Sequence, residues 1–156
     1  MPSRRELIRM TDGEIRRYLE GQRRIILITN GPDGLPHPVP MNYGLDDAGR
    51  ILITSFSKSQ KVKNLERDPR ATLLVESGVR YQELQAVIVY ADAEIVRDID
   101  AIRQGMSRMR ADSALTAGMS AAMDEQIRES LAKRVLLRFT PFRFVSWDHG
   151  KLGDKY

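Results

Sequence analysis

Segments with the composition of β-strands follow one another along this chain with little between them but tight turns, and this succession limits the folds open to it. They span residues 24–30, 36–44, 50–55, 70–76, 84–96 and 134–147. A parallel sheet needs a regular alternation of strands with crossover helices, and that alternation is absent here. The sequence therefore predicts a mainly β protein of the α+β class, built on an antiparallel barrel with appended helices.

Two turns show where the chain reverses in its first half. Residues 31–34 combine a proline, which presets φ, with a glycine at each end, and glycine accepts a positive φ. Residues 46–49 have similar turn chemistry, beginning at Asp46 and ending at Gly49. The prolines between residues 36 and 40 exclude a helix and suit an edge or bulged strand.

Helical periodicity appears in three segments, 11–21, 57–67 and 98–132. Thr11 and Glu14 have the spacing of a capping box, in which the hydroxyl accepts from the amide of Glu14 and the carboxylate reaches back. We therefore predict one domain over residues 1–156. It has an N-terminal helical segment over residues 1–22 and a helical insertion over residues 98–132 before the closing strand.

Composition excludes several classes of function. The chain has no cysteine, so no disulfide scaffold and no thiolate chemistry is available. Its net charge of +4 comes from interspersed acids and bases rather than a basic stripe with aromatics, which argues against a nucleic-acid partner. No apolar run approaches the roughly 20 residues of a membrane span, and residues 1–9 lack the pattern of a signal peptide. We expect no membrane partner and a cytoplasmic protein.

Catalytic and metal-ligating side chains are not identifiable by pattern. His37 and His149 are the two histidines, and neither has a partner at metal-ligand spacing, so no metal site is predicted. No Ser-His-Asp set or other catalytic residue is predicted either.

The segment around residues 54–64 carries the chemistry that the sequence does show. A predicted strand ends at Thr54 and Ser55, and further serines and lysines, among them Ser59 and Lys61, precede or begin a helix. Free amides at a helix start, with hydroxyls and an ammonium group beside them, suit an anion such as a phosphate. A capped helix with solvated lysines fits the same residues, and the residues alone leave both interpretations open.

Several motifs occur in a characteristic order along nearly the whole chain. They are the turn Asp33, Gly34, Pro36 and His37; the strand end Thr54 and Ser55; Lys61 followed by Asn64, Leu65 and residues 67–70; Tyr81 and Leu84 before the long strand; and the closing residues 145–152. In this order and spacing the sequence resembles the pyridoxamine-phosphate-oxidase-like family of flavin- and deazaflavin-dependent split β-barrels.

The resemblance implies a homodimeric split barrel with two equivalent cofactor sites at the interface. The implied cofactor is FMN or the deazaflavin coenzyme F-420. Lys61 is expected to contact its phosphate, with help from residues at the end of the third strand and the start of the helix. A segment of the second strand is expected to run beside the ring system, and the closing residues to reach toward the site. The implied cofactor-binding residues are Lys61, Thr54, Ser55, Ser59, Gln60, Met41, Asn42, Tyr43, Trp147 and Lys151.

One departure from the family pattern concerns substrate. The oxidase proper carries an arginine for the phosphate on its second strand, and residues 38–42 of this chain hold none. This weakens the expectation that the chain oxidises pyridoxamine phosphate.

The implied function is an oxidoreductase that transfers hydride or electrons between its flavin-type cofactor and a small organic substrate. The cofactor ring supplies that chemistry, so the lack of an obvious acid or base is compatible with it. Two alternatives stay open: a non-catalytic flavin-binding or sensing module, and a split barrel without a cofactor.

Overall fold

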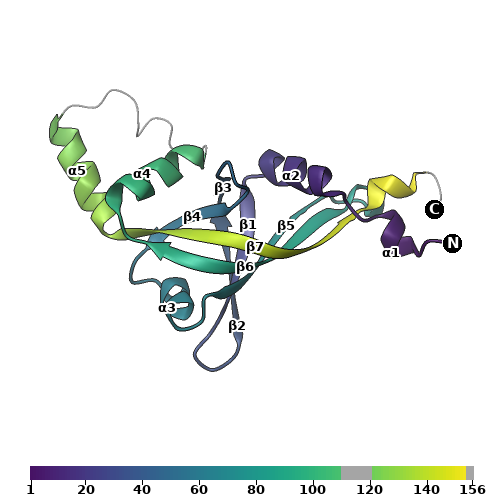
Figure 1. Cartoon of the computed structure of the whole chain (residues 1–156), viewed down its shortest axis with the longest axis horizontal. Helices are drawn as coiled ribbons and strands as arrows, with labels where there is room; N and C mark the ends of the chain where they lie inside the picture. Colours follow the sequence, from purple (N-terminus) through teal and green to yellow (C-terminus); the bar gives the residue numbers. More distant parts are fainter. Residues whose placement is uncertain (110–120, 154–156) are drawn as a thin grey trace.

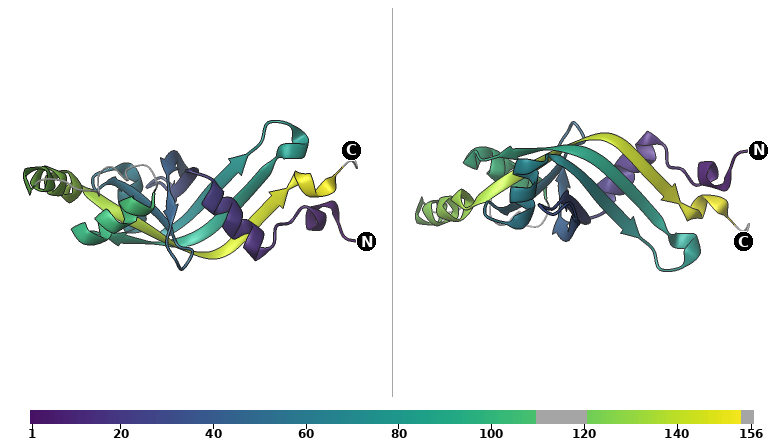
Figure 2. Two further views of the ribbon diagram at one scale, coloured as in Figure 1. Left: turned by 90° about the horizontal axis from the view of Figure 1, so that it is seen from above. Right: turned by 90° about the horizontal axis from the view of Figure 1, so that it is seen from below.

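The computed structural model describes residues 1–109 and 121–153, with side chains throughout these ranges except at residues 121–124. One seven-stranded antiparallel sheet, in the order β2-β1-β5-β6-β7-β4-β3, curls into a half-barrel (Figures 1 and 2). Its strands are β1 (Arg24–Asn30), β2 (Pro36–Asn42), β3 (Gly44–Leu45), β4 (Ile51–Phe56), β5 (Arg70–Ser77), β6 (Gln85–Val96) and β7 (Arg134–Asp148). The predicted α+β split-barrel class is confirmed.

Helices flank the sheet at its ends and in its connections. They are α1 (Arg4–Leu7), α2 (Asp12–Gly21), α3 (Gln60–Arg67), α4 (Ile99–Arg108) and α5 (Ala121–Ala132), with 3₁₀ turns η1 (Tyr81–Glu83) and η3 (His149–Leu152). The predicted helical insertion over 98–132 contains α4 and α5, and residues 110–120 between them lie outside the described residues. None of the helices in the described ranges has the length and apolar character needed to cross a lipid bilayer.

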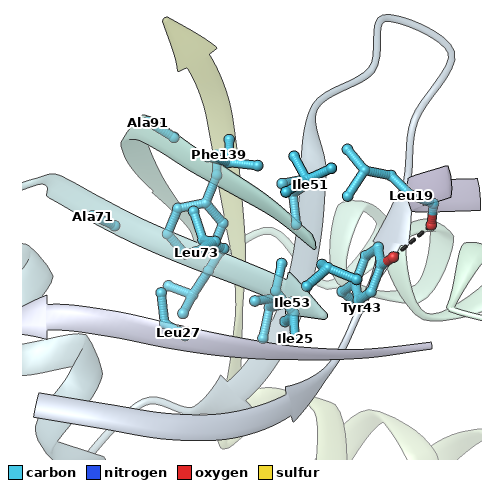
Figure 3. Close-up of a cluster of buried hydrophobic side chains, with 14 of the residues drawn as sticks. Leu19, Ile25, Leu27, Tyr43, Ile51, Ile53, Ala71, Leu73, Ala91 and Phe139 are labelled. Carbon is cyan, nitrogen blue, oxygen red and sulfur yellow. Dashed lines mark hydrogen bonds between the residues drawn. The ribbon is translucent and has the colours of Figure 1, made fainter. Parts of the chain in front are cut away.

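Alternation along the strands gives the sheet a core face and an outer face. The core face carries the main apolar cluster, which includes Ile25, Leu27, Ile53, Leu73 and Phe139 (Figure 3). Helix α2 adds apolar side chains to the same cluster. Because the strands supply most of this cluster, their sequences are rich in apolar residues.

Helices α4 and α5 cover the part of the outer face that β4 and the start of β7 form. Leu52 and Leu136 form a second apolar cluster there with Ile102 of α4 and Leu131 of α5. Gly105 allows the close approach of α4, because a Cβ atom at this position would lie 2.6 Å from a methyl carbon of Leu136. The helical insertion therefore serves as a cover for this part of the sheet.

The start of α2 corrects one detail of the sequence prediction. The Thr11 hydroxyl accepts from the amide of Glu14 at 3.2 Å, as predicted. The Glu14 carboxylate binds Lys151 Nζ at 2.6 Å, so the predicted return arm of the capping box is wrong. A complete capping box occurs instead at Ser3 and Glu6, at the start of α1, a short helix inside the predicted segment 1–22 that the sequence analysis did not identify separately.

The two ends of the described chain are fastened to each other. The amide of Asp148 donates to the carbonyl of Ile8 at 2.7 Å, and the amide of Met10 donates to the Ser146 hydroxyl at 3.1 Å. This places α1 and η3 side by side at one end of the elongated molecule, while α3 and α4 lie toward the other end (Figures 1 and 2).

Candidate functional site

The start of α3 has backbone donors that nothing in the described chain satisfies. The predicted helix over 57–67 begins later, at Gln60, because residues 56–59 form a turn in which the amide of Ser59 donates to the carbonyl of Phe56 at 3.1 Å. Ser59 occupies the N-cap position, but its hydroxyl caps no amide. It pairs instead with the Ser55 hydroxyl at 2.9 Å. The amides of the first turn therefore keep their capacity to bind an anion.

Lys61 lies in this first turn and is half-buried. Burial lowers the pKa of its ammonium group, and no charged or hydrogen-bonding partner acts on it within the described residues. A partly desolvated cation without a counter-charge gains from binding an anion. Lys61 and the start of α3 thus form a coherent candidate site for an anionic group.

Buried polar contacts fix α3 in place. The side-chain amide of Asn64 donates to the Thr29 hydroxyl of β1 at 3.0 Å, and both residues are fully buried. Gln60, another predicted site residue, donates its side-chain amide to Asn64 Oδ1 at 2.8 Å. Asn64 therefore orients the helix on β1, and the side chain of Gln60 is occupied within the helix.

Thr54 and Ser55 project to opposite faces of β4. Ser55 lies opposite Val135 on the core face, whereas Thr54 lies opposite Leu136 on the outer face. Only the Ser55 hydroxyl is bonded to Ser59. The structure thus brings Ser55, Ser59 and Lys61 to the start of α3 and directs Thr54 to the other side of the strand.

The outer face beside Thr54 holds an arginine that the sequence reasoning missed. Arg134, at the start of β7, lies opposite Phe56 in the β4–β7 register, with its guanidinium carbon 4.5 Å from the Phe56 ring centroid. Because β4 and β7 are far apart in sequence, no local pattern could predict that Arg134 contacts Phe56.

The predicted ring-flanking residues have different environments. Met41 lies opposite Ile25 and packs against the main core cluster. Tyr43 is buried, its hydroxyl donates to the carbonyl of Leu19 (Figure 3), and burial raises the pKa of that hydroxyl. Asn42 is exposed. Of the three, Asn42 is the most exposed, Met41 is half-buried and Tyr43 is buried.

The closing residues lie away from α3 in a single chain. Lys151 Nζ donates to the carbonyl of Arg9 at 2.7 Å and pairs with Glu14, whose pKa it lowers through their hydrogen bond. Trp147 is half-buried opposite Ala86. Both belong to the end of the molecule that carries the described chain ends (Figure 1). Within one chain the structure therefore does not bring them to Lys61.

Metal binding has no visible basis in the described side chains, those of residues 1–109 and 125–153. No three acidic or histidine side chains gather there in a way that fits a metal ion.

The curled antiparallel sheet defines a split barrel. Its inserted helix α3 presents free amides and an uncompensated lysine, which together form a candidate anion site. The chain matches the family model described as pyridoxamine 5'-phosphate oxidase over residues 11–148, and it belongs to that family. A search of curated proteins found no match.

Three solved structures illustrate the similarity. A conserved hypothetical protein from Mycobacterium tuberculosis is 35% identical, with 97% of this chain and 93% of that chain covered and a TM-score of 0.82. An F420 reductase is 22% identical, with 82% and 93% covered and a TM-score of 0.61. An FAD-binding protein from Mesorhizobium loti is 18% identical, with 88% and 94% covered and a TM-score of 0.66. The last two share the fold.

Proposed function

We propose that this chain is a cytoplasmic oxidoreductase that holds FMN or the deazaflavin coenzyme F-420 by its phosphate and exchanges hydride or electrons with a small organic substrate. The observation that carries this proposal is the start of α3, where uncapped amides lie beside the half-buried, uncompensated Lys61. Membership of the family, and a shared fold with an F420 reductase and an FAD-binding protein, support a flavin-type cofactor.

The role of the chain in this function is to bind and to orient. Lys61 and the amides at the start of α3 would neutralise the phosphate, and the Ser55–Ser59 hydroxyl pair would offer further hydrogen bonds. Asn64 holds these groups in position through Thr29. The flavin or deazaflavin ring supplies the hydride chemistry when it is bound.

A homodimer is the second part of the proposal. Five apolar residues lie in register on the outer face across five neighbouring strands: Pro40, Ile26, Leu74, Ile88 and Val145. We call this set the apolar row. Each of its residues is at least partly exposed in one chain, and an aligned apolar surface of this kind favours association. We infer that it pairs with the same row of a second copy, as a twofold interface requires.

The dimer would also explain the position of the closing residues. Trp147 lies on the outer face two residues beyond Val145, so it borders the apolar row. Because Trp147 and Lys151 are far from α3 in one chain, their predicted contribution needs a second copy to supply them. We propose cofactor sites shared between two chains for this reason.

Steady-state turnover separates the proposed enzyme from its alternatives. The dimer loaded with reduced cofactor is offered a broad panel of small organic acceptors, and reoxidation of the cofactor is followed spectroscopically. Turnover faster than free cofactor alone supports the oxidoreductase. Binding without turnover over the whole panel supports a flavin-binding or sensing module, and failure to bind supports a cofactor-free barrel.

A further inference from the structure

Thr54, Phe56 and Arg134 share the outer face at the edge of the β4–β7 pair. Thr54 lies opposite Leu136 and Phe56 lies opposite Arg134, so Thr54 and Arg134 are diagonal neighbours across the two strands. Diagonal neighbours on one face are about 7–8 Å apart, which long side chains bridge. Thr54 is 8% exposed, and it and Arg134 lie on the same part of this face.

The charge of Arg134 is uncompensated in the described part of the chain. Its guanidinium lies over the ring of Phe56, which is 57% exposed, and no carboxylate among the described side chains, those of residues 1–109 and 125–153, forms an ion pair with it. Stacking on an aromatic face leaves the N–H groups of a guanidinium available in its own plane. Arg134 is therefore pre-positioned by Phe56 with its donors unused.

Backbone hydrogen bonds connect Lys133, the residue before Arg134, with the turn that precedes α3. The carbonyl of Phe56 accepts from the amide of Ser59 at 3.1 Å, and the amide of Ser57 donates to the carbonyl of Lys133 at 2.9 Å. The turn over residues 56–59 thus joins the start of β7 to the N-terminus of α3. Lys61 follows this turn by two residues, and Arg134 lies opposite Phe56, at which the turn begins.

Local charge around the turn is also one-sided. Lys58 and Lys133 join Lys61 and Arg134 there, and none of the four forms an ion pair with a carboxylate among the described side chains. A concentration of unpaired positive charge attracts and retains an anion more strongly than one lysine does.

We propose that Arg134 is a second binding residue for the phosphate group of the cofactor, acting together with Thr54 and the start of α3. This inference rests on the proposed function and deepens it. A guanidinium binds phosphate through two parallel hydrogen bonds, which complements the point charge of Lys61. Thr54 adds a hydroxyl on the face of β4 that also carries Arg134 across the strand pair.

The test compares two ligands with the same ring. FMN carries the phosphate and riboflavin lacks it, so the ratio of their dissociation constants reports the phosphate contacts alone. We expect Arg134→Gln to weaken FMN binding about 10- to 100-fold and to leave riboflavin binding unchanged. Arg134→Lys keeps the positive charge but lacks the planar guanidinium. Its FMN affinity should lie between those of the wild type and Arg134→Gln. If the protein binds coenzyme F-420 instead, the coenzyme and its phosphate-free deazaflavin core replace this pair.

Arg80→Gln is the matched control, because Arg80 is an exposed arginine at the start of η1 whose ion pair is with Glu83 and not with a residue of α3. It should change neither constant, and the ligand-free melting temperature of each variant checks that the fold is intact. Equal weakening of both ligands by Arg134→Gln would show a structural or ring contact and overturn the inference, as would no weakening. If Lys61→Ala weakens FMN binding while Arg134→Gln does not, the role of Arg134 is wrong but the proposed function stands. If the wild-type protein binds neither cofactor, both the role of Arg134 and the proposed function are wrong.

Discussion

The hydroxyl of Ser59 lies 2.9 Å from that of Ser55, so the residue at the N-cap position of α3 leaves the helix uncapped. Thr11 of α2 and Asp98 of α4 occupy the same position in their helices, and their side chains do accept from a helix amide. A helix that forgoes its cap gives up about 1 kcal/mol of stability and keeps its amides for another acceptor.

A residue that caps α3 should therefore raise the stability of the protein and lower its affinity for the ligand. Ser59→Asp places a carboxylate where it can accept from the first-turn amides, and we expect a higher melting temperature without ligand. The same carboxylate competes with and repels a phosphate, so FMN affinity should fall at least about tenfold. Thermal unfolding and a binding titration measure the two effects.

Ser59→Asn is the control for that substitution, since asparagine caps a helix without adding charge. It should stabilise the protein with a smaller loss of affinity. Equal or better FMN binding by Ser59→Asp would contradict a phosphate at this position.

The buried hydrogen bond between Asn64 and Thr29 should make a measurable contribution to stability. Thr29→Val leaves the Asn64 amide without its acceptor, and we expect a loss of about 1–3 kcal/mol in the free energy of unfolding, measured with urea. Combining Thr29→Val with Asn64→Leu removes both partners, so the double variant should lose less than the sum of the two single variants. Strict additivity would show that the two side chains are energetically independent.

The proposed dimer can be tested at the centre of the apolar row. Leu74→Glu places a charge opposite Ile88 and in the middle of the inferred interface, and we expect it to yield monomers in sedimentation analysis. The monomer should also bind the cofactor more weakly if the sites are shared between chains. Val79→Glu is a suitable control, because Val79 is 93% exposed in the β5–η1 turn and lies outside the row. Dimers of unchanged affinity in both variants would place the interface elsewhere.

Asp68 should make stability depend on pH in the acid range. Its carboxylate accepts from Arg70 and Asn30, and the Arg70 hydrogen bond is the main reason that its pKa falls to about 2. Because the pKa is lower in the folded state, the stabilisation is present above the unfolded value of about 3.9 and is lost as the pH falls through 2.

Asp68→Asn should thus be less stable than wild type at pH 7, with the difference vanishing between about pH 4 and pH 2. Denaturant unfolding across this range checks the expectation, with the exposed Asp100→Asn as a control of equal charge change. A difference that persisted unchanged at pH 2 would assign the effect to packing rather than to the carboxylate.

Local sequence signals predicted the elements that local physics determines. The apolar runs, the turn at residues 31–34 and the Thr11 cap follow from alternation, φ preferences and a three-residue spacing, and the structure confirms them. The Ser3–Glu6 capping box was visible by the same spacing and was missed. In the structure Met41 and Val39, two residues apart on β2, both pack against the core cluster.

Contacts between distant segments were not predictable in this way. Glu14 has its partner, Lys151, at the other end of the chain, and a helix-start glutamate is otherwise read as part of a capping box. Arg134 meets Phe56 only because β4 pairs with β7 rather than with a neighbour in sequence. Ser59 is a capping residue by type, and only the structure shows its hydroxyl bonded to Ser55.

The central claim is that the start of α3 holds a phosphate-bearing flavin-type cofactor, and a binding titration tests it most directly. Purified protein is titrated separately with FMN and with coenzyme F-420, following cofactor fluorescence and thermal stabilisation, since a ligand of the folded state raises its stability. We predict saturable binding of one of them at micromolar concentration, weakened by about 1.5–3 kcal/mol in Lys61→Ala. A folded wild-type protein that binds neither cofactor, or a Lys61→Ala variant that binds as tightly as wild type, would contradict the claim.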